Sequence, residues 1–83
     1  MNYLEYIALF TTTIEAIKYL RKLEDLKVDA EAIPMPRKLS SSCGIAISFS
    51  LKDDPSRIVD QSIRQLYRVE GDQYILLLQN EEG

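Results

Sequence analysis

The chain has 83 residues, of which 46% are hydrophobic and 28% charged, and its formal net charge at pH 7 is -3. This length leaves room for one hydrophobic core, so we expect a single domain over 1–83 with a disordered tail at about 80–83. The acidic balance argues against a nucleic-acid partner, because binding to phosphates requires clustered Lys and Arg side chains.

The side-chain inventory excludes several kinds of chemistry. The chain has one cysteine and no histidine. One cysteine cannot form an intramolecular disulfide, and without histidine neither a Ser-His-Asp nor a Cys-His site can be built. A zinc site would need one Cys together with carboxylates, which is an unusual ligand set. We therefore expect no metal and no cofactor, and a carrier or binding protein rather than an enzyme.

The N-terminal stretch MNYLEYIALF bears on localisation. It is apolar but has no basic leader, and Glu5 interrupts it. No run approaches the roughly 18 apolar residues that a membrane helix needs. We expect a cytoplasmic protein that does not bind a membrane.

The first predicted elements are a strand and a helix. Tyr3 to Phe10 is rich in aromatic and β-branched residues and predicts a central strand. Thr12 and Glu15 fit a capping box, so a helix should begin near Thr13. Its predicted apolar row repeats every three residues and consists of Ile14, Ile17, Leu20, Leu23 and Leu26.

Two strands should follow. Val28 to Ile33 alternates apolar and charged residues, and the nearby Pro34 and Pro36 favour an edge position. The stretch 45–51 also alternates. Its bulky side chains should share one face, leaving Ala46, Ser48 and Ser50 on the other.

A second helix is predicted within the stretch 52–71. Asp54 can cap it, and Pro55 suits the first helical position. Its apolar stripe would be Val59, Ile63, Leu66 and Tyr67, and Gly71 would follow its end. A last strand should run from Asp72 to Gln79. The resulting order, βαββαβ, predicts an α+β ferredoxin-like sandwich with a four-stranded antiparallel sheet and two helices on one face.

The predicted connection from 34 to 44 holds the lone cysteine. Its eleven residues are long for a hairpin connection. Arg37 and Lys38 bring positive charge near Cys43, and Gly44 allows amide groups to converge on one atom. The supporting hydroxyl groups come from Ser40, Ser41 and Ser42. Cations and hydrogen-bond donors favour the thiolate, although a buried cysteine acting as a small apolar residue is the commoner situation.

The stretch IPMPRKLSSSCGIAI, after YIALF and TTTIEAIKYL, resembles a family of small bacterial domains labelled selenium/sulfur carrier-like. The resemblance implies that Cys43 carries sulfur or selenium from a donor protein to an acceptor protein. It also implies that Arg37 and Gly44 are the nearest motif partners of Cys43. Better-known carriers hold the cysteine in a Cys-Pro-x-Pro motif at a helix N-terminus. Here Gly44 follows the cysteine, so that helix dipole is not expected to act.

Two alternatives remain open from the residues alone. The Ser-rich loop with Arg37 and Lys38 could instead bind an anion or small molecule in a regulatory module. The chain could also be a dimeric interaction domain, in which Tyr3, Tyr6 and Tyr74 and the apolar last strand form a homodimer.

Overall fold

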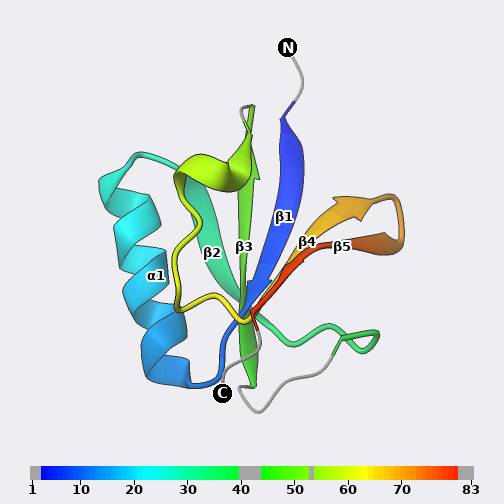
Figure 1. Cartoon of the computed structure of the whole chain (residues 1–83), viewed down its shortest axis with the longest axis horizontal. Helices are drawn as coiled ribbons and strands as arrows, with labels where there is room; N and C mark the ends of the chain where they lie inside the picture. The colour runs from blue at the N-terminus through cyan, green and yellow to red at the C-terminus, as the bar shows by residue number, and fades with distance from the viewer. Residues whose placement is uncertain (1–2, 40–43, 53, 81–83) are drawn as a thin grey trace.

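The computed structural model describes residues 3–39, 44–52 and 54–80 (Figure 1). In chain order, its elements are β1 (Leu4–Leu9), α1 (Thr13–Asp25), β2 (Asp29–Pro34), β3 (Ile45–Leu51), the 3-10 helix η1 (Pro55–Arg57), β4 (Gln65–Glu70) and β5 (Gln73–Gln79). The strands form one sheet in the order β2-β3-β1-β4-β5, and every neighbouring pair is antiparallel. In this order β2 lies at one edge of the sheet, which confirms the edge position predicted for the second strand from Pro34 and Pro36.

The ferredoxin-like prediction is wrong. The described residues hold one α-helix and five strands, whereas the sequence predicted two helices and four strands. The first half of the chain does agree, because β1, α1, β2 and β3 follow one another as the predicted strand, helix and two strands. The predicted second helix is replaced by η1, an irregular segment over 58–64, and β4.

The backbone of this segment finds hydrogen-bond partners outside a helix. In a helix, the carbonyl of Ile58 would accept from the N–H of Ser62. Here that carbonyl accepts from the Tyr19 hydroxyl at 2.8 Å, and the Ser62 N–H donates to the Asp60 carboxylate at 2.8 Å. The N–H of Arg64 donates to the carbonyl of Leu9. An Asp-Ser turn of this kind competes directly with helical bonding.

The β4–β5 hairpin has a turn signal that the helix interpretation overlooked. Glu70 pairs with Gln73, so the loop consists of Gly71 and Asp72. Gly71 has φ 61° while Asp72 has no positive φ, which matches a type II′ turn with glycine first. Gly71 therefore starts a hairpin, and does not follow a helix end.

The start of α1 confirms the predicted helix start and the Thr12 half of the capping box, whereas Oε1 of Glu15 is buried without a hydrogen-bond partner among the described residues. The hydroxyl of Thr12 accepts a hydrogen bond from the N–H of Glu15 at 3.2 Å, and the helix begins at Thr13. The predicted apolar row is only partly right. The fully buried face consists of Ala16, Tyr19 and Leu23, whereas Ile14 is 69% exposed.

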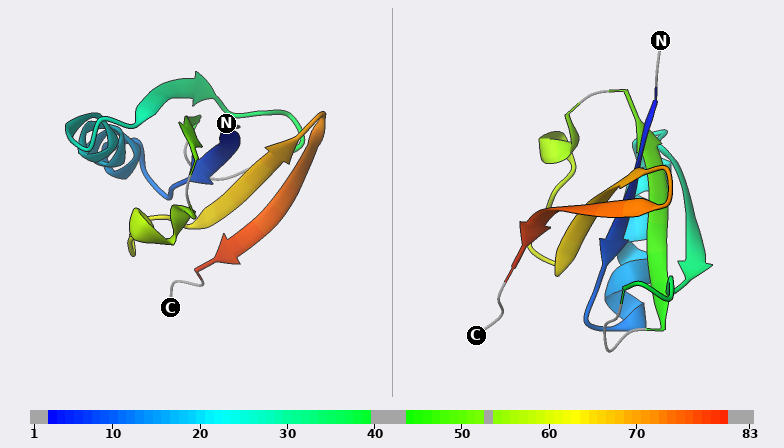
Figure 2. Two further views of the ribbon diagram at one scale, coloured as in Figure 1. Left: turned by 90° about the horizontal axis from the view of Figure 1, so that it is seen from above. Right: turned by 90° about the vertical axis from the view of Figure 1, so that its right-hand side faces the viewer.

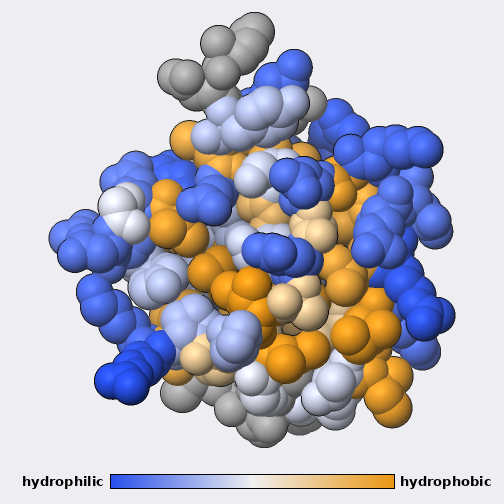
Figure 3. All heavy atoms as spheres, turned by 180° about the vertical axis from the view of Figure 1, so that it is seen from behind, coloured by the Kyte–Doolittle hydropathy of each residue, from blue (hydrophilic) through white to orange (hydrophobic). Residues whose placement is uncertain are grey.

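The sheet has a hydrophobic cluster on each face. Figure 2 shows α1 and η1 on one side of the sheet and the segment that follows β2 on the other. The larger cluster lies on the face of the sheet that α1 covers, with Phe10, Tyr19, Ile47 and Phe49 at its centre. The smaller cluster lies on the helix-free face around Ile7, Leu9 and Ala46. Seen from behind, hydrophobic side chains occupy much of the middle and lower surface, bordered by hydrophilic ones (Figure 3).

Gly71→Ala should lower the free energy of unfolding by about 1–2 kcal/mol, because a side chain disfavours the left-handed backbone. Denaturant unfolding measures this difference. Gly44→Ala is the matched control, because an added Cβ meets nothing within 4 Å among the described residues and its φ is not left-handed. An equal loss in both variants would contradict the turn assignment.

Candidate functional site

The base of the connection between β2 and β3 is closed by the antiparallel pairing of these two strands. Pro34 pairs with Ile45, and beyond this pair the N–H of Met35 donates to the carbonyl of Gly44 at 3.2 Å. The two arms therefore remain together after the strands end. Gly44, the neighbour of the cysteine in sequence, is held at this base.

A tight turn follows over residues 36–39. The N–H of Leu39 donates to the carbonyl of Pro36 at 3.0 Å, which places Arg37 and Lys38 at the exposed centre of the turn. Met35 and Leu39 pack against the helix-free cluster. The apolar side chains thus hold this half of the connection on the sheet, while the cations face solvent.

The two cations of the turn differ in their contacts. The ammonium of Lys38 donates to the carbonyl of Asp72 at 2.8 Å, which joins the turn to the β4–β5 loop. The guanidinium of Arg37 has no hydrogen-bond or ion-pair partner within the described ranges 3–39, 44–52 and 54–80. Its charge is therefore available to a nearby anion.

The predicted site is only partly described. Pro34, Pro36, Arg37, Lys38 and Gly44 all lie at one end of the sheet. Ser40, Ser41, Ser42 and Cys43 lie outside the described residues. Their predicted contacts with one another and with Arg37 remain predictions.

An open groove of about 420 Å³ borders the turn. It is lined by Lys38, Leu39, Tyr67, Gln73 and Tyr74. The rings of Tyr67 and Tyr74 meet edge to face, with 6.4 Å between their centroids. The groove combines aromatic surface with one ammonium group, and the sequence did not predict it because β4 was assigned to a helix.

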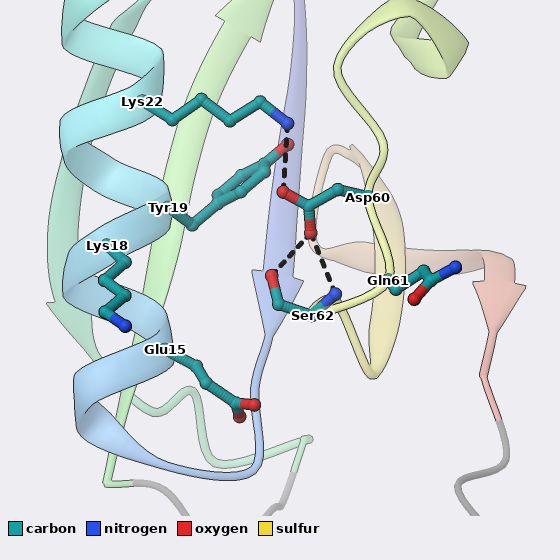
Figure 4. A pocket seen from close by; sticks show the side chains of 7 residues that line it. All are labelled: Glu15, Lys18, Tyr19, Lys22, Asp60, Gln61 and Ser62. Atoms are coloured by element: carbon teal, nitrogen blue, oxygen red, sulfur yellow. Dashed lines mark hydrogen bonds and ion pairs between the residues drawn. The ribbon is translucent and has the colours of Figure 1, made fainter.

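A second polar cluster lies on the opposite side of the sheet, between α1 and the 58–64 segment (Figure 4). The Lys22 ammonium contacts the Asp60 carboxylate at 2.9 Å, and the Ser62 hydroxyl donates to the same carboxylate. These groups line an open pocket of about 640 Å³ together with Glu15, Lys18, Tyr19 and Gln61. Sequence reasoning missed this cluster because Lys22 and Asp60 are 38 positions apart and share no motif.

The charge states of Asp60 and Tyr19 in this cluster indicate a structural role. Burial alone would raise the pKa of Asp60, but hydrogen bonds from Ser62 and Lys22 outweigh it and lower that pKa. Burial, together with the charge of Asp60, raises the pKa of the Tyr19 hydroxyl far above its ordinary value. The carboxylate therefore stays charged and the phenol neutral at pH 7, which suits a fixed contact better than proton transfer.

A comparison with models of protein families shows to which family the chain belongs. A family model described as "Putative Se/S carrier protein-like" matches residues 5–64. The chain belongs to this family. The Se/S carrier-like match confirms the resemblance found in the sequence, and it includes both the connection with Cys43 and the Lys22–Asp60 pair. Neither the search of curated proteins nor the search of solved structures found a significant match.

The Se/S carrier-like match ends at Arg64, directly before β4. The β4–β5 hairpin therefore lies outside the matched residues, although Lys38 contacts it and Tyr67 and Tyr74 line the groove beside the turn.

The described part of the chain holds neither a cluster of metal-ligating side chains nor a helix long and apolar enough to span a membrane. Residues 3–39, 44–52 and 54–80 contain no group of three or more His, Cys, Asp or Glu side chains that could hold a metal ion. Within the same ranges, α1 is the longest helix, and none has the length and apolar character of a membrane span.

Asp60→Asn should weaken the fold most clearly at neutral pH. Because folding lowers the pKa of Asp60, its contribution is present above the unfolded value of about 3.9 and is lost as pH falls through the folded value. Both partners are more than a third exposed, so solvent screening limits the expected loss to at most about 1 kcal/mol. Urea unfolding at pH 7 and pH 3 should show a difference from wild type that shrinks at pH 3. Asp29→Asn, on the edge strand, is the control, and an equal change there would contradict this assignment.

Proposed function

We propose that this chain carries sulfur or selenium on Cys43 between a donor protein and an acceptor protein. The observation that supports this proposal is the Se/S carrier-like match over residues 5–64, which spans the connection holding the chain's one cysteine. A carrier of this kind needs a nucleophilic thiol and two partners, and it needs no metal or cofactor of its own.

The transfer step balances without an added oxidant. The Cys43 thiolate attacks the outer sulfur of a donor persulfide, R–S–SH. A bond forms between Cys43 and that sulfur while the donor S–S bond breaks, which gives Cys43–S–SH and the donor thiolate. An acceptor thiolate then attacks the outer sulfur in the same way and regenerates the Cys43 thiolate. For selenium, the transferred atom is selenium and the balance is unchanged.

The residues near Cys43 in the sequence have different roles in this proposal. Arg37 supplies a cation whose guanidinium has no partner among the described residues, and positive charge favours a thiolate. Lys38 is already bonded to the carbonyl of Asp72, so its main role is to anchor the turn. The bond between Met35 and Gly44 closes the connection beside the cysteine. The hydroxyls of Ser40, Ser41 and Ser42 are proposed as donors to the carried anion.

The direct test is to look for the carried atom. Protein treated with glutathione persulfide and freed of excess reagent should gain about 32 Da on the peptide containing Cys43, and dithiothreitol should remove the gain. Selenodiglutathione plus glutathione, the selenium probe, should add about 79 Da at the same peptide. If the thiol reacts with neither reagent until the protein is denatured, the carrier proposal fails.

A further inference from the structure

The groove beside the turn is formed by two separate parts of the chain. Lys38 contributes from the turn, and Tyr67 and Tyr74 contribute from the β4–β5 hairpin. The ammonium of Lys38 donates to the carbonyl of Asp72 at 2.8 Å, which holds the hairpin beside the turn (Figure 2). The turn belongs to the same connection as Cys43, so a ligand in this groove lies next to the residues that lead into the proposed site.

The groove is bordered by two cations. Its lining contains the ammonium of Lys38 and no carboxylate among the described residues. The adjacent Arg37 is exposed, and its guanidinium has no hydrogen-bond or ion-pair partner within residues 3–39, 44–52 and 54–80. Of the two acidic residues at the hairpin tip, Glu70 is paired with Arg68 at 2.6 Å, and Asp72 does not line the groove. An anionic ligand therefore meets two positive charges here, although the whole chain carries -3.

The rest of the groove suits an extended peptide segment. The rings of Tyr67 and Tyr74 are half-buried and pack on the helix-free cluster, so little freedom is lost when a ligand contacts them. Tyrosine is enriched at protein interfaces, because it offers a flat apolar ring with a polar end. The exposed side-chain amide of Gln73 can both donate to and accept from a peptide backbone. A small molecule would need a more enclosed pocket than this open groove.

Given the carrier function of Cys43, on which this inference rests, we propose that the donor protein docks in this groove through an acidic segment. In that segment, carboxylate side chains flank the cysteine that holds the persulfide. One carboxylate pairs with the Arg37 guanidinium, and the peptide lies along the rings of Tyr67 and Tyr74. The outer sulfur passes to the Cys43 thiolate as its S–S bond to the donor breaks, so the donor leaves as a thiolate.

The chemistry of the groove disfavours other donors. A basic segment would be repelled by Arg37 and Lys38, and a neutral segment would leave the guanidinium of Arg37 unpaired. The contact is also small, and interfaces below about 1,200 Å² are typical of transient encounters. A carrier must release its donor after each transfer, so a weak contact that is selected by charge suits this role.

Three synthetic persulfide peptides test the preference for acidic donors. Each is a blocked tripeptide with a central cysteine persulfide, flanked on both sides by glutamate, glutamine or lysine. At about 0.01 M salt, Cys43 should accept sulfur about two- to fivefold faster from the glutamate peptide than from the glutamine peptide, and most slowly from the lysine peptide. Dividing each rate by the rate of the same peptide with 2-mercaptoethanol corrects for the reactivity of the peptide itself. Salt at about 1 M should remove the difference, because the screening length falls to about 3 Å.

Arg37→Gln should slow all three peptides through the thiolate and should also bring the ratio of the glutamate rate to the glutamine rate toward one. Arg21→Gln is the matched control, because it removes the same charge from the exposed surface of α1, on the other side of the sheet, and should keep the ratio. A ratio that survives Arg37→Gln, or falls equally in both variants, overturns the inference. If the peptides react at one rate, or not at all while glutathione persulfide reacts, the acidic donor is wrong and the carrier function stands. If glutathione persulfide does not react either, the carrier function fails.

Binding without transfer is the second readout. In Cys43→Ser, a blocked Glu-Ser-Glu tripeptide at millimolar concentration should shift the NMR amide signals of Lys38, Gln73 and Tyr74 more than those of α1. A blocked Lys-Ser-Lys tripeptide should not produce these shifts, and Tyr74→Ala should weaken them for the acidic peptide. Equal shifts with both peptides, or shifts confined to other parts of the chain, would show that the groove is not the docking site.

Discussion

Cys43→Ser is expected to abolish the acceptance and transfer of sulfur and selenium completely. Serine keeps a hydroxyl donor at this position but loses the nucleophile, because a hydroxyl is a weak nucleophile unless an adjacent base activates it. The chain has no histidine to act as that base. The measurement is the amount of labelled sulfur bound after reaction with glutathione persulfide, followed by its release to a second thiol.

Two further variants separate the thiol from its surroundings. Leu39→Met changes the same connection but keeps an apolar side chain against the helix-free cluster, so it should retain transfer and show that loss in Cys43→Ser does not come from altering the loop in general. Arg37→Gln should slow acceptance several-fold at neutral pH, because it removes a cation that favours the thiolate. If Cys43→Ser keeps full biological activity, the anion-binding alternative gains the support that the carrier proposal loses.

The parts of the fold that the sequence predicted are those with local signals. Thr12 and Glu15 cap α1 through one hydrogen bond three residues apart, so the capping pair was visible in the sequence. The alternation along β3 was also correct, because Ile47 and Phe49 lie in the larger cluster and Ala46 in the smaller one. A period of two along a strand depends only on the pleat and not on distant contacts.

The second helix failed for a tertiary reason. Ile63 and Leu66 of the predicted stripe are buried and Val59 packs against the same cluster, but an irregular segment and a strand place them there. The competing bonds come from Tyr19 and Leu9, which lie far away in the sequence. Two local signals pointed to the alternative: the Asp60–Ser62 turn, which competes with helical bonding, and the Gly71–Asp72 pair, a two-residue hairpin turn.

The candidate site has both a local and a tertiary part. The motif with Arg37, Cys43 and Gly44 is local in the sequence and lies within the residues that the family model matches, and its role stays a prediction. The contact of Lys38 with Asp72 depends on the β4–β5 hairpin, so it could not be inferred from a wrong assignment of that region. The same error hid the groove beside the turn.

Tyr19→Ala is expected to cause the largest loss of stability, about 3–5 kcal/mol, which is comparable to the whole stability of so small a domain. The Tyr19 ring lies 5.2 Å from Phe10 and 6.2 Å from Phe49, between centroids, and it is 2% exposed. Its hydroxyl also binds the carbonyl of Ile58. The side chain therefore joins α1, the sheet and the irregular segment, and its removal leaves a cavity among all three.

Tyr19→Phe separates the hydrogen bond from the ring. It should cost about 1–2 kcal/mol, because the carbonyl of Ile58 loses its donor while the packing remains. Tyr19→Phe should also change how the free energy of unfolding depends on pH under alkaline conditions. Since folding raises the pKa of Tyr19, its contribution is complete below the ordinary value of about 10 and declines as pH rises through the folded value, a decline that phenylalanine cannot show. Urea unfolding at pH 7 and pH 11 measures both effects. If the phenylalanine variant is as unstable as the alanine variant, the hydrogen bond, and not the ring, holds the segment that replaced the predicted helix.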